Sequence, residues 1–467
     1  MIHSSVMENN IHHCKGPLCD DIIFEILRFF DTMFILRVGM KISKQWREVS
    51  FQIPLALSFY NKVSSQSGPK FVELIAKSDN LKNLTSLHLY QNNIGEGVKY
   101  IVTSEHLKNL TSLTLSGNIG SEGVKYVSES ENLKNLMLLD LSFNDMGDEG
   151  VQFIANSSYL NNITSLDLGE NNIGNEGVKL IVSTENLNNL TSLYLYDNNI
   201  GHVGVEAITN SEKLHKLTLL DLSSNDMGPE ETKLITNCKY FNNLTSLDLS
   251  FNNVSSVGAE AIAKSSNMKN LTSLSLSSSN IDRDGAKYIF ASEYLKYLME
   301  LNLQCNNLGT EGIRYISISD NVKNITCLDL SRNFLGPEGA KLISSSCNLK
   351  NVTSLNLSRT RIGHEGTKVI SGSDNLKYLT LLNISTNDIR NEGAKFISNS
   401  EKLKNLMTLN LSSNGISSQG IKFIASGHNL KNLTVLDLSF NNIGHEDVKS
   451  ISESEYLKNL IEFLHYR

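Results

Sequence analysis

Polar and apolar residues alternate in a short phrase that returns along most of the chain. In "TSLDLS", Leu247 and Leu249 take alternate positions, and Ser246, Asp248 and Ser250 take the positions around them. Because successive side chains of a strand point to opposite faces, the phrase predicts a short strand with one leucine face. The stretch "xEGVKxI" that follows predicts a helix, whose Val and Ile residues face the strand leucines.

The strand and helix together form one unit of a long internal repeat. The first two steps between units are 26 residues and the later steps are 27 residues, and a last partial copy is marked by Leu460. The apolar residue that opens the strand phrase falls at positions 84, 110, 136, 163, 190, 217, 244, 271, 298, 325, 352, 379, 406 and 433. One unit cannot bury its own apolar face, so neighbouring units must stack. The sequence therefore predicts a solenoid of about 14 repeats plus partial ends over residues 71–467.

Two positions of the repeat have a clear physical purpose. An asparagine such as Asn252 follows the strand, and its amide can satisfy backbone groups that would otherwise be buried and unpaired. Twelve of the fourteen units have Asn at this position, with Ser279 and Thr360 as departures, so we expect an asparagine ladder. Pro229 and Pro337 precede the acidic residue of the helix phrase, and proline suits the first position of a helix.

The consensus L-T-S-L-x-L-S-x-N-x-I-G-x-E-G-V-K-x-I resembles the leucine-rich repeat, most closely its longer, ribonuclease-inhibitor-like type. Strands pack about 4.8 Å apart, whereas helices need about 8–10 Å, so such a stack must curve. The expected fold is an α/β leucine-rich repeat solenoid shaped as a horseshoe. A parallel sheet would line its concave face and helices its convex face.

The first seventy residues carry no repeat. Residues 1–15 are polar, and we expect a disordered tail there; His3, His12, His13 and Cys14 lack the fixed geometry of a metal site. Residues 16–62 contain apolar stripes at helical spacing, which predict a small all-α domain. Residues 63–70, with "SSQSGP", form the expected linker to the repeats.

The helical segment resembles an F-box. The family pattern has an acidic pair near its start, then a helix rich in Ile and Leu, and ends with a small residue, Lys, any residue, Trp and Arg. Two features depart from it: Cys19 stands where proline is usual, and one extra residue lies between Arg37 and Trp46. The matching residues are Leu18, Asp21, Ile22, Ile26, Leu27, Leu36, Arg37, Ser43, Lys44, Trp46 and Arg47.

The resemblance implies that the segment docks a Skp-type adaptor of a cullin ubiquitin ligase. The apolar contacts would come from Leu18, Ile22, Ile26, Leu27, Leu36, Val38 and Trp46. A plain helical cap that shields the first repeat is the alternative, because a solenoid needs covered ends.

Composition narrows the possible partners and the compartment. The formal net charge is -7 and the pI is about 5.9, so nothing indicates binding to nucleic acid or to an anionic membrane. The N-terminus lacks the apolar stretch of a signal peptide, and no apolar run is long enough to span a membrane. The six cysteines have no regular spacing and indicate reduced thiols. We therefore expect a cytoplasmic or nuclear protein in which the Asn-Leu-Thr triplets carry no glycans.

The concave face is the expected substrate-binding surface. Six of its fourteen central strand positions are aspartates, namely Asp140, Asp167, Asp221, Asp248, Asp329 and Asp437. This acidic row would favour a basic partner. The alternative is that Leu-Asp-Leu-Ser is only the consensus of the repeat. Residues that break the consensus are further candidates: Tyr90, Tyr194, Tyr196, Arg332 and Arg359, with Arg361 beside them.

The sequence shows no catalytic constellation, no phosphate-binding loop and no Cys or His pair at zinc spacing. We therefore expect a protein that is not an enzyme and needs no cofactor or metal. The hypothesis is a substrate-recognition subunit of a Skp/cullin/F-box ubiquitin ligase that holds a protein on its concave repeat face. The alternatives are a ribonuclease-inhibitor-like binding protein and a Ran-GAP-like GTPase regulator, in which the N-terminus is only a cap.

Overall fold

The structure, a computed structural model, describes residues 18–28, 30–60 and 67–466. The expected tail and the first half of the expected linker, residues 63–66, lie outside these ranges. The chain folds into two compact units. Unit 1 comprises Met1–Ile173 with Ser183–Leu190, and unit 2 comprises Gly174–Val182 with Thr191–Arg467.

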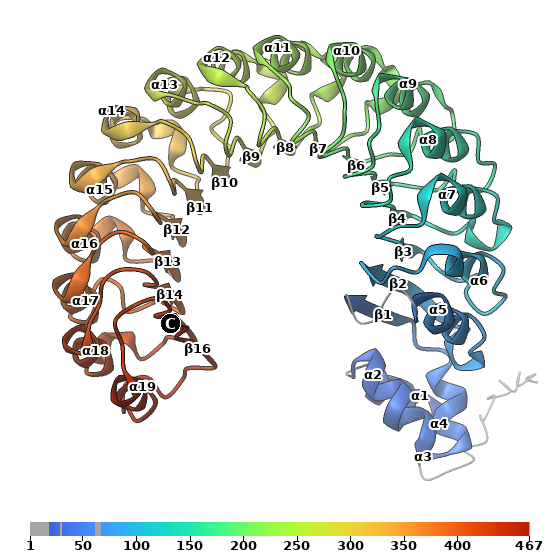
Figure 1. The fold of residues 1–467 in the computed structure, drawn as a ribbon, viewed down its shortest axis with the longest axis horizontal. Coiled ribbons are helices and arrows are strands. Elements are labelled where there is room, and N and C mark those ends of the chain that lie inside the picture. The colour runs from blue at the N-terminus through green and yellow to red at the C-terminus, as the bar shows by residue number, and fades with distance from the viewer. Residues whose placement is uncertain (1–17, 29, 61–66, 467) are drawn as a thin grey trace, which may run out of the picture. The chain divides into compact units, whose positions relative to one another are not determined.

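Unit 1 contains the helical segment and the first repeats (Figure 1). Its helices are α1 (Asp20–Arg28), α2 (Thr32–Phe34), α3 (Met40–Ile42), α4 (Lys44–Ser50), α5 (Gly68–Ala76), α6 (Val98–Val102), α7 (Gly120–Ser128) and α8 (Gly147–Ala155), with the π-helix η1 (Ile35–Gly39) and the 3-10 helices η2 (Asp79–Leu81), η3 (Gly95–Gly97) and η4 (Glu131–Leu133). Its strands are β1 (Leu55–Tyr60), β2 (Leu84–Tyr90), β3 (Ser112–Thr114), β4 (Leu138–Asp140) and β5 (Ser165–Asp167). These strands are parallel and follow chain order in the sheet.

Strand β1 corrects the expected boundary of the helical segment. Residues 55–60 were predicted to belong to an all-α domain, but they form a parallel strand that pairs with β2 from Leu55–Leu84 to Tyr60–Tyr90. The physical reason is alternation, since Leu55 and Leu57 are buried while Ala56 and Ser58 are exposed. The sheet therefore begins before the first recognisable repeat. Helix α5 then starts at Gly68, inside the range expected for the linker.

Unit 2 continues the same strand–helix unit. Its strands are β6 (Ser192–Tyr194), β7 (Leu219–Asp221), β8 (Ser246–Asp248), β9 (Ser273–Ser275), β10 (Glu300–Asn302), β11 (Cys327–Asp329), β12 (Ser354–Asn356), β13 (Leu381–Asn383), β14 (Thr408–Asn410), β15 (Val435–Asp437) and β16 (Glu462–Leu464). Neighbouring strands are parallel and in register, so that Leu220, Leu247 and Leu274 form one row.

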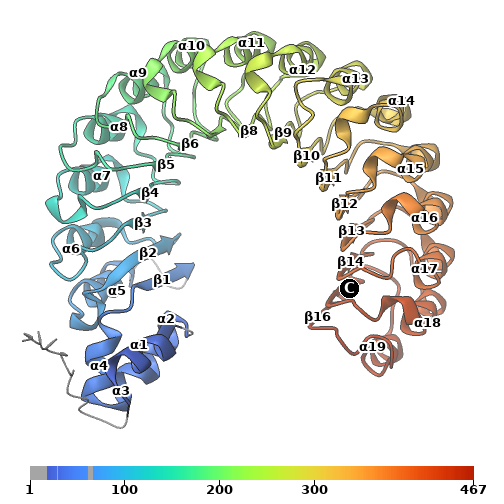
Figure 2. The same ribbon diagram turned by 180° about the vertical axis from the view of Figure 1, so that it is seen from behind.

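The helices of unit 2 follow the strands one by one. They are α9 (Asn175–Ser183), α10 (His202–Asn210), α11 (Pro229–Asn237), α12 (Ser255–Lys264), α13 (Arg283–Ala291), α14 (Gly309–Arg314), α15 (Gly336–Ser345), α16 (Gly363–Ser371), α17 (Arg390–Ser398), α18 (Ser418–Ala425) and α19 (His445–Ser452). Short 3-10 helices lead to the next strand: η5 (Glu212–Leu214), η6 (Lys239–Phe241), η7 (Ser266–Met268), η8 (Tyr315–Ser317), η9 (Asp320–Val322), η10 (Cys347–Leu349), η11 (Asp374–Leu376) and η12 (His428–Leu430). Within unit 2, strands β6–β16 lie on the inner side of an arc and the helices on its outer side (Figures 1 and 2).

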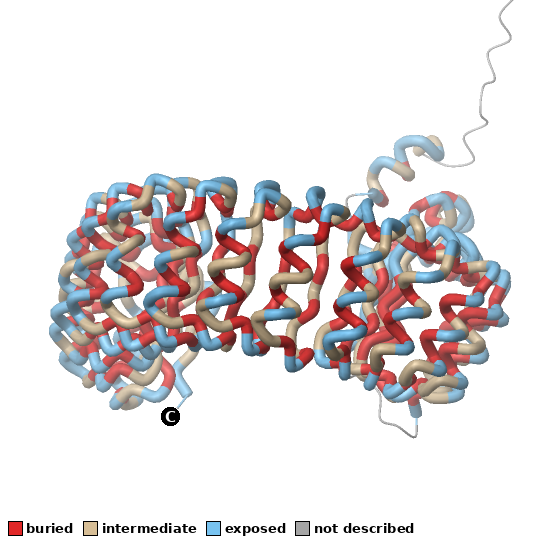
Figure 3. The backbone as a smooth tube through the Cα atoms, turned by 90° about the horizontal axis from the view of Figure 1, so that it is seen from above, coloured by how far each residue is buried: buried red, intermediate tan, exposed pale blue. Residues whose placement is uncertain are grey.

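The core lies between the strands and the helices of each unit. Strand leucines such as Leu247 and Leu249 are fully buried, as is Ile262 of the helix that follows. Buried and exposed residues alternate along the helices (Figure 3), as expected for helices with one apolar face. Helices α11 and α15 have Pro229 and Pro337 in their first turn, which confirms the predicted helix starts.

The predicted asparagine ladder is present. The amide nitrogen of Asn252 donates to the carbonyl oxygens of Leu222, Leu249 and Ser250 at 2.9, 3.1 and 3.2 Å. Its Oδ1 accepts from the backbone N–H groups of Asn225 at 3.0 Å and Met227 at 2.9 Å in the preceding repeat. One buried side chain thus satisfies backbone groups of two repeats.

One rung differs from the expectation. The shortened phrase "SGNIG" places Gly117 on the ladder, because its N–H and that of Ile119 donate to Asn144 Oδ1 at 3.2 and 3.0 Å. Asn118 is exposed and instead donates to Asn93 Oδ1 at 3.0 Å. Gly117 has a φ of +113°, and an added Cβ would lie 3.2 Å from Gln91 Cα, so a side chain fits poorly there. The ladder therefore departs from asparagine at Gly117 as well as at Ser279 and Thr360.

Candidate functional site

The N-terminal helices expose an unusual amount of apolar side chain. The exposed fractions are 47% for Ile22 and 43% for Val38, whereas Leu18, Ile26, Leu36 and Trp46 are half-buried. Leu27 is fully buried, so its predicted contact with an adaptor is wrong: it belongs to the core of the segment. Three further apolar residues, Phe30, Met33 and Ile42, are exposed but were not among the predicted adaptor contacts, because periodicity alone does not show which apolar residues of a helical segment stay uncovered.

A π-helix lies close to the position where the sequence has one residue more than the F-box pattern, between Arg37 and Trp46. Residues Ile35–Gly39 form η1, in which the hydrogen bonds span one more residue than in an α-helix. A single inserted residue is accommodated there without breaking the helix. Ser43 then caps α4 by accepting a hydrogen bond from the Trp46 N–H at 3.2 Å.

The helical segment is attached to the first repeat by specific contacts. Asn83 donates from its side chain to the carbonyl oxygens of Ser50, at 3.1 Å, and Ile53. The Ala56 N–H donates to Thr32 Oγ1 at 3.0 Å, and the Lys82 ammonium lies 4.0 Å from the Phe51 ring centroid. The segment therefore also covers this end of the sheet, as the cap hypothesis requires.

In unit 1, the predicted strand-face residues are Tyr90, Asp140 and Asp167. Tyr90 is half-buried, with its ring centroid 6.0 Å from that of His88. Asp140 is buried and accepts from the Ser142 N–H and hydroxyl at 3.0 and 2.7 Å. His88 bridges Ser86 and Thr114; burial lowers its pKa, and the charge of Asp140 opposes that shift. Asp167 accepts from the Gly169 N–H at 2.9 Å, so both aspartates bind groups two residues further along the chain.

In unit 2, Asp221 and Asp248 occupy neighbouring positions of the strand face, and Tyr194 is in register with Asp221. Asp221 accepts from the Ser223 N–H at 2.9 Å and the Ser223 hydroxyl at 2.7 Å. Burial, together with the charge of the nearby Asp248, raises the pKa of Asp221 to about 6. Burial also raises the pKa of Asp248. These two carboxyls of the predicted acidic row therefore take up a proton at higher pH than exposed aspartates do.

The other two aspartates of unit 2 use both carboxylate oxygens. Asp329 accepts from Ser331 at Oδ1 and from the Asn356 side chain at Oδ2, at 2.6 and 2.7 Å. Asp437 accepts from the Ser439 N–H at 2.9 Å and the Asn410 side chain at 3.0 Å. The aspartates thus close the turn after each strand, which favours the interpretation that they are consensus residues. Tyr194 and Tyr196 are half-buried in the same face.

The consensus-breaking arginines gather on two consecutive loops of unit 2. Arg332 follows β11, Arg359 and Arg361 follow β12, and all three are exposed. The Arg361 guanidinium lies 4.5 Å from the ring centroid of Phe334, which is itself 55% exposed. We call Arg332, Phe334, Arg359 and Arg361 the arginine cluster.

Two cavities lie in the same part of unit 2, beside residues that precede the strands. One of ≈ 630 Å³ is lined by Asn270, Thr272, Tyr297, Met299, Asn324, Thr326 and Asn351. The second, of ≈ 490 Å³, is lined by Asn351, Thr353, Tyr378, Thr380 and Asn405. They share Asn351, and we call the two adjacent cavities together the tyrosine groove.

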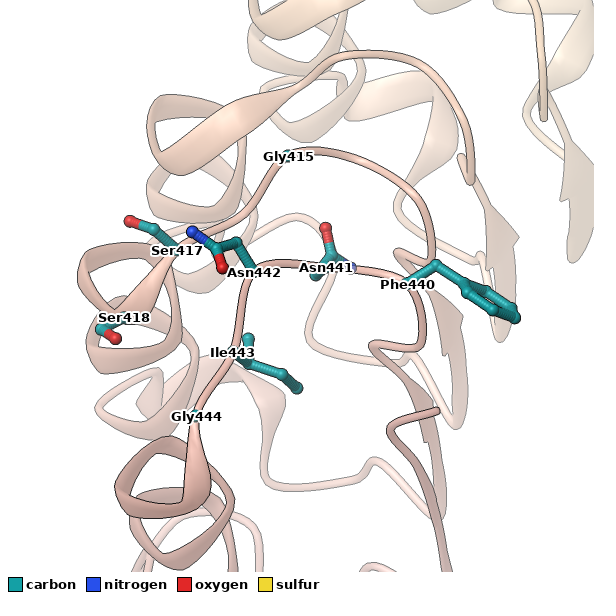
Figure 4. A pocket seen from close by; sticks show the side chains of 8 residues that line it. All are labelled: Gly415, Ser417, Ser418, Phe440, Asn441, Asn442, Ile443 and Gly444. Carbon is teal, nitrogen blue, oxygen red and sulfur yellow. The ribbon is translucent and has the colours of Figure 1, made fainter. Parts of the chain in front are cut away.

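A third cavity, of ≈ 950 Å³, lies beside the last repeat between Phe440 and Gly444 (Figure 4). Asn441 and Ile443, which line this cavity, are equivalent to Asn414 and Ile416 of the preceding repeat. There the backbone N–H groups of Asn414 and Ile416 donate to Asn441 Oδ1. The cavity is therefore the position that a following repeat fills elsewhere in the solenoid, which is a feature of the stacking.

The lysines of the outer helices are structural. Lys179 pairs with Glu176 at 2.7 Å, and Lys395 pairs with Glu392 at 3.7 Å, as the helix spacing predicts. Lys395 also lies 5.7 Å from the ring centroid of Phe423 in the next repeat. This contact between helices was not predicted from the sequence, although a lysine on one helix and an aromatic residue at the next helix could have indicated it.

Two observations bear on compartment and redox state. Among the described helices, none combines the length and apolar character needed to cross a bilayer. Cys19, Cys238, Cys305, Cys327 and Cys347 all have free thiols.

Comparisons with known proteins address the repeats. Among solved structures, an internalin from Listeria monocytogenes is 22% identical with a TM-score of 0.47, and covers 79% of this chain and 93% of its own. A chain of the TLR13–ssRNA13 complex is 20% identical with a TM-score of 0.39, and covers 82% of this chain and 58% of its own. No curated protein matches the sequence.

The family model described as "Leucine Rich repeat" matches more than half of the chain. The matches are residues 132–155, 159–182, 186–208, 213–230, 242–263, 267–290, 294–317, 323–344, 348–371, 375–398, 402–425 and 429–452. They begin after the helical segment, so the F-box resemblance stays a prediction. The matched residues coincide with the strand–helix units of the structure, and the chain belongs to the leucine-rich repeat family.

Proposed function

We propose that this protein is the substrate-recognition subunit of a Skp/cullin/F-box ubiquitin ligase. The N-terminal helices would bind a Skp-type adaptor, and the strand face of the repeats would hold a protein substrate. The chain itself would perform no chemistry, because its role is to position a substrate for catalysis by other subunits.

The observation that carries this proposal is the exposed apolar surface of the helical segment. Ile22, Phe30, Met33, Val38 and Ile42 are each at least 38% exposed, although the segment has a core in which Ile23 and Leu27 are fully buried. Large exposed apolar side chains gathered in one small segment are typical of a protein interface. A plain cap needs to cover only the side that faces the first repeat.

The π-helix η1 supports the F-box resemblance. The extra residue before Trp46 is the main spacing difference from the family pattern, and η1 absorbs one additional residue. The Ser43–Trp46 turn then forms a regular capped helix start, as the end of the family pattern requires.

The test is co-purification of the full chain with a Skp-type adaptor. Replacing Ile22 and Val38 by Asp changes two exposed side chains, so the fold should persist while binding weakens by at least about tenfold. Leu74→Asp is the matched control, because Leu74 is 66% exposed on α5, outside the helical segment. Thermal unfolding of each variant confirms that it is folded.

Adaptor binding by the parent chain and Leu74→Asp, but not by Ile22→Asp/Val38→Asp, would support the proposal. Absence of binding by the parent chain would exclude it and leave the ribonuclease-inhibitor-like alternative, a binding solenoid with a helical cap. Point variants are better than deletion of residues 1–62, because that deletion would also remove strand β1.

A further inference from the structure

The arginine cluster is a positive site without an internal counter-ion. Arg332 and Arg359 occupy equivalent positions of consecutive repeats, so their backbones are about 5 Å apart. The backbone N–H groups of Arg332 and Arg359 donate to the carbonyl oxygens of Ser358 and Ser385 in the next repeats, at 2.9 and 3.0 Å. These bonds hold the two loops in place. Within the described chain, none of the three guanidinium groups forms an ion pair or a hydrogen bond with a carboxylate.

The nearest carboxylates of these repeats are already engaged. Asp388 occupies the position equivalent to Arg361 in the next repeat, but it binds the guanidinium of Arg390 through two contacts of 2.9 Å. Asp329 uses both oxygens on Ser331 and Asn356. Arg361 instead stacks on Phe334, an arrangement that leaves its N–H donors available to a ligand.

The tyrosine groove lies on the same repeats, at the other end of the strands. In the consensus an asparagine precedes the apolar residue that opens the strand, but here Tyr297 and Tyr378 replace it, 53% and 52% exposed. Met299, 48% exposed, replaces the usual threonine. Three repeat steps separate the tyrosines, which places them about 14 Å apart.

Between the tyrosines the groove offers hydrogen-bond acceptors. Asn324 and Asn351 each donate Nδ2 to a lysine carbonyl of the preceding repeat at 2.7 Å. No donor of the described chain binds their Oδ1 atoms. A groove lined by both apolar side chains and carboxamide oxygens matches a peptide, which supplies both apolar side chains and backbone N–H donors.

We propose that repeats β10–β13 bind an acidic peptide segment of the partner protein. Its phosphate or carboxylate groups would bind Arg332, Arg359 and Arg361, and an apolar side chain would enter the tyrosine groove. The proposal rests on the proposed function only in taking the strand face as the surface that holds a protein. It names the chemistry of that partner as acidic, in place of the basic partner that the aspartate row suggested.

The dimensions of the site suit an extended peptide. Thr326 lines the groove and Arg332 belongs to the cluster, and strand β11 lies between them. Six residues of extended chain cover about 20 Å, so a peptide of similar length reaches from one feature to the other. Guanidinium groups bind phosphate in a bidentate manner, so phosphoserine should bind more tightly than glutamate.

The test uses fluorescence anisotropy of the full chain with short labelled peptides. The probes are a glutamate-rich peptide, the same peptide with phosphoserine, a lysine-rich peptide and oligo-dT, each peptide made with and without a central leucine. The variants are Arg332→Ala/Arg359→Ala/Arg361→Ala and Tyr297→Ala/Tyr378→Ala. Arg314→Ala is the matched control, because it removes an exposed guanidinium that pairs with Glu311 on the outer helix α14 and leaves the acids beside the cluster unchanged.

We expect the parent chain and Arg314→Ala to bind the acidic peptides, with phosphoserine preferred. The triple variant should bind about a hundredfold more weakly, and the tyrosine variant should lose the advantage given by leucine. Absence of acidic-peptide binding, equal binding by the triple variant, or tighter binding of the lysine peptide or oligo-dT would each overturn the proposal. Binding of the Skp-type adaptor is measured on the same samples. A chain that binds the adaptor but no acidic peptide would overturn this proposal and leave the proposed function standing.

Discussion

Two pairs of neighbouring repeats in unit 2 show how one consensus serves different purposes. At β7–β8, Asn225 and Asn252 complete the ladder, and the Asp221 and Asp248 carboxyls lie side by side. At β11–β12, Thr360 replaces the ladder asparagine and exposed arginines occupy the loops. In the first pair, which follows the consensus, the polar side chains bind groups of the same or the neighbouring repeat. In the second pair, which departs from the consensus, the charged arginine side chains are exposed and can bind a partner.

The ladder differs between the two pairs in a definite way. Thr360 donates to the Leu357 carbonyl of its own repeat at 2.5 Å and does not bind the Leu330 carbonyl of the preceding one. No oxygen of Thr360 accepts from Asn333 or Leu335, although Asn252 accepts from both equivalent N–H groups. Among the described repeats, β11 and β12 are therefore joined by fewer side-chain hydrogen bonds than β7 and β8.

The largest effect is expected at the regular pair. Asn252→Ala should lower the free energy of unfolding by about 3 kcal/mol, because it leaves two backbone N–H groups and the Leu222 carbonyl without partners in a buried turn. Urea unfolding followed by circular dichroism measures the change. An effect below about 0.5 kcal/mol, typical of a surface substitution, would show that the ladder adds little stability.

A smaller and opposite effect is expected for Asp221→Asn at neutral pH. The pKa of Asp221 is raised to about 6 in the fold, so its contribution to stability is complete below about pH 4 and is lost as pH rises through about 6. Asparagine can keep the bond to the Ser223 N–H, as Asn410 does with Ser412, but cannot ionise. The variant should therefore gain about 1–2 kcal/mol at pH 7, with allowance for partial exposure.

Unfolding of both proteins at about pH 4.5 and pH 7 tests this prediction, together with an NMR titration of the Asp221 carboxyl. The stability of the parent should fall between these pH values by more than that of the variant. A variant that is less stable than the parent at pH 7 would contradict the assignment.

The smallest effect should come from repairing the ladder at the irregular pair. Thr360→Asn supplies a donor for the Leu330 carbonyl and an acceptor for the N–H groups of Asn333 and Leu335, and should raise stability by about 1 kcal/mol. Thr360→Val is the control, since it removes the hydroxyl and adds no ladder bond. Equal stability of the Asn variant and the parent would show that the missing ladder hydrogen bonds at Thr360 do not lower the free energy of unfolding.

Most of the repeat architecture could be predicted from the sequence, because it depends on short-range patterns. Alternating leucines determine the strands, the 27-residue period determines the stacking, and Asn252 and its equivalents determine the turns. The candidate site was predicted less well. The sequence singled out Arg332, Arg359 and Arg361, but it could not show that their neighbouring acids are engaged elsewhere.

The limits of prediction are clearest where a residue's surroundings come from other repeats. Strand β1 was missed because it lies outside the repeat period, and Asn118 was placed on the ladder because a one-residue deletion can be aligned in two ways. Leu27 and Ile22 belong to the same apolar helical stripe, yet one is fully buried and the other is 47% exposed. Periodicity identifies a stripe, and packing decides which of its members are covered.

The sequence by itself determined the repeated strand–helix unit, its parallel stacking and the leucine core, since each depends on patterns within one or two repeats. Only the tertiary structure decided which charged groups are free. The Asp221 and Asp329 carboxylates bind partners two residues away or in the next repeat. The guanidinium groups of the arginine cluster pair with none of the acids in the described residues, and Asp388 beside them is bound by Arg390. The charge that each surface presents depends on these contacts between repeats, which the sequence alone does not show.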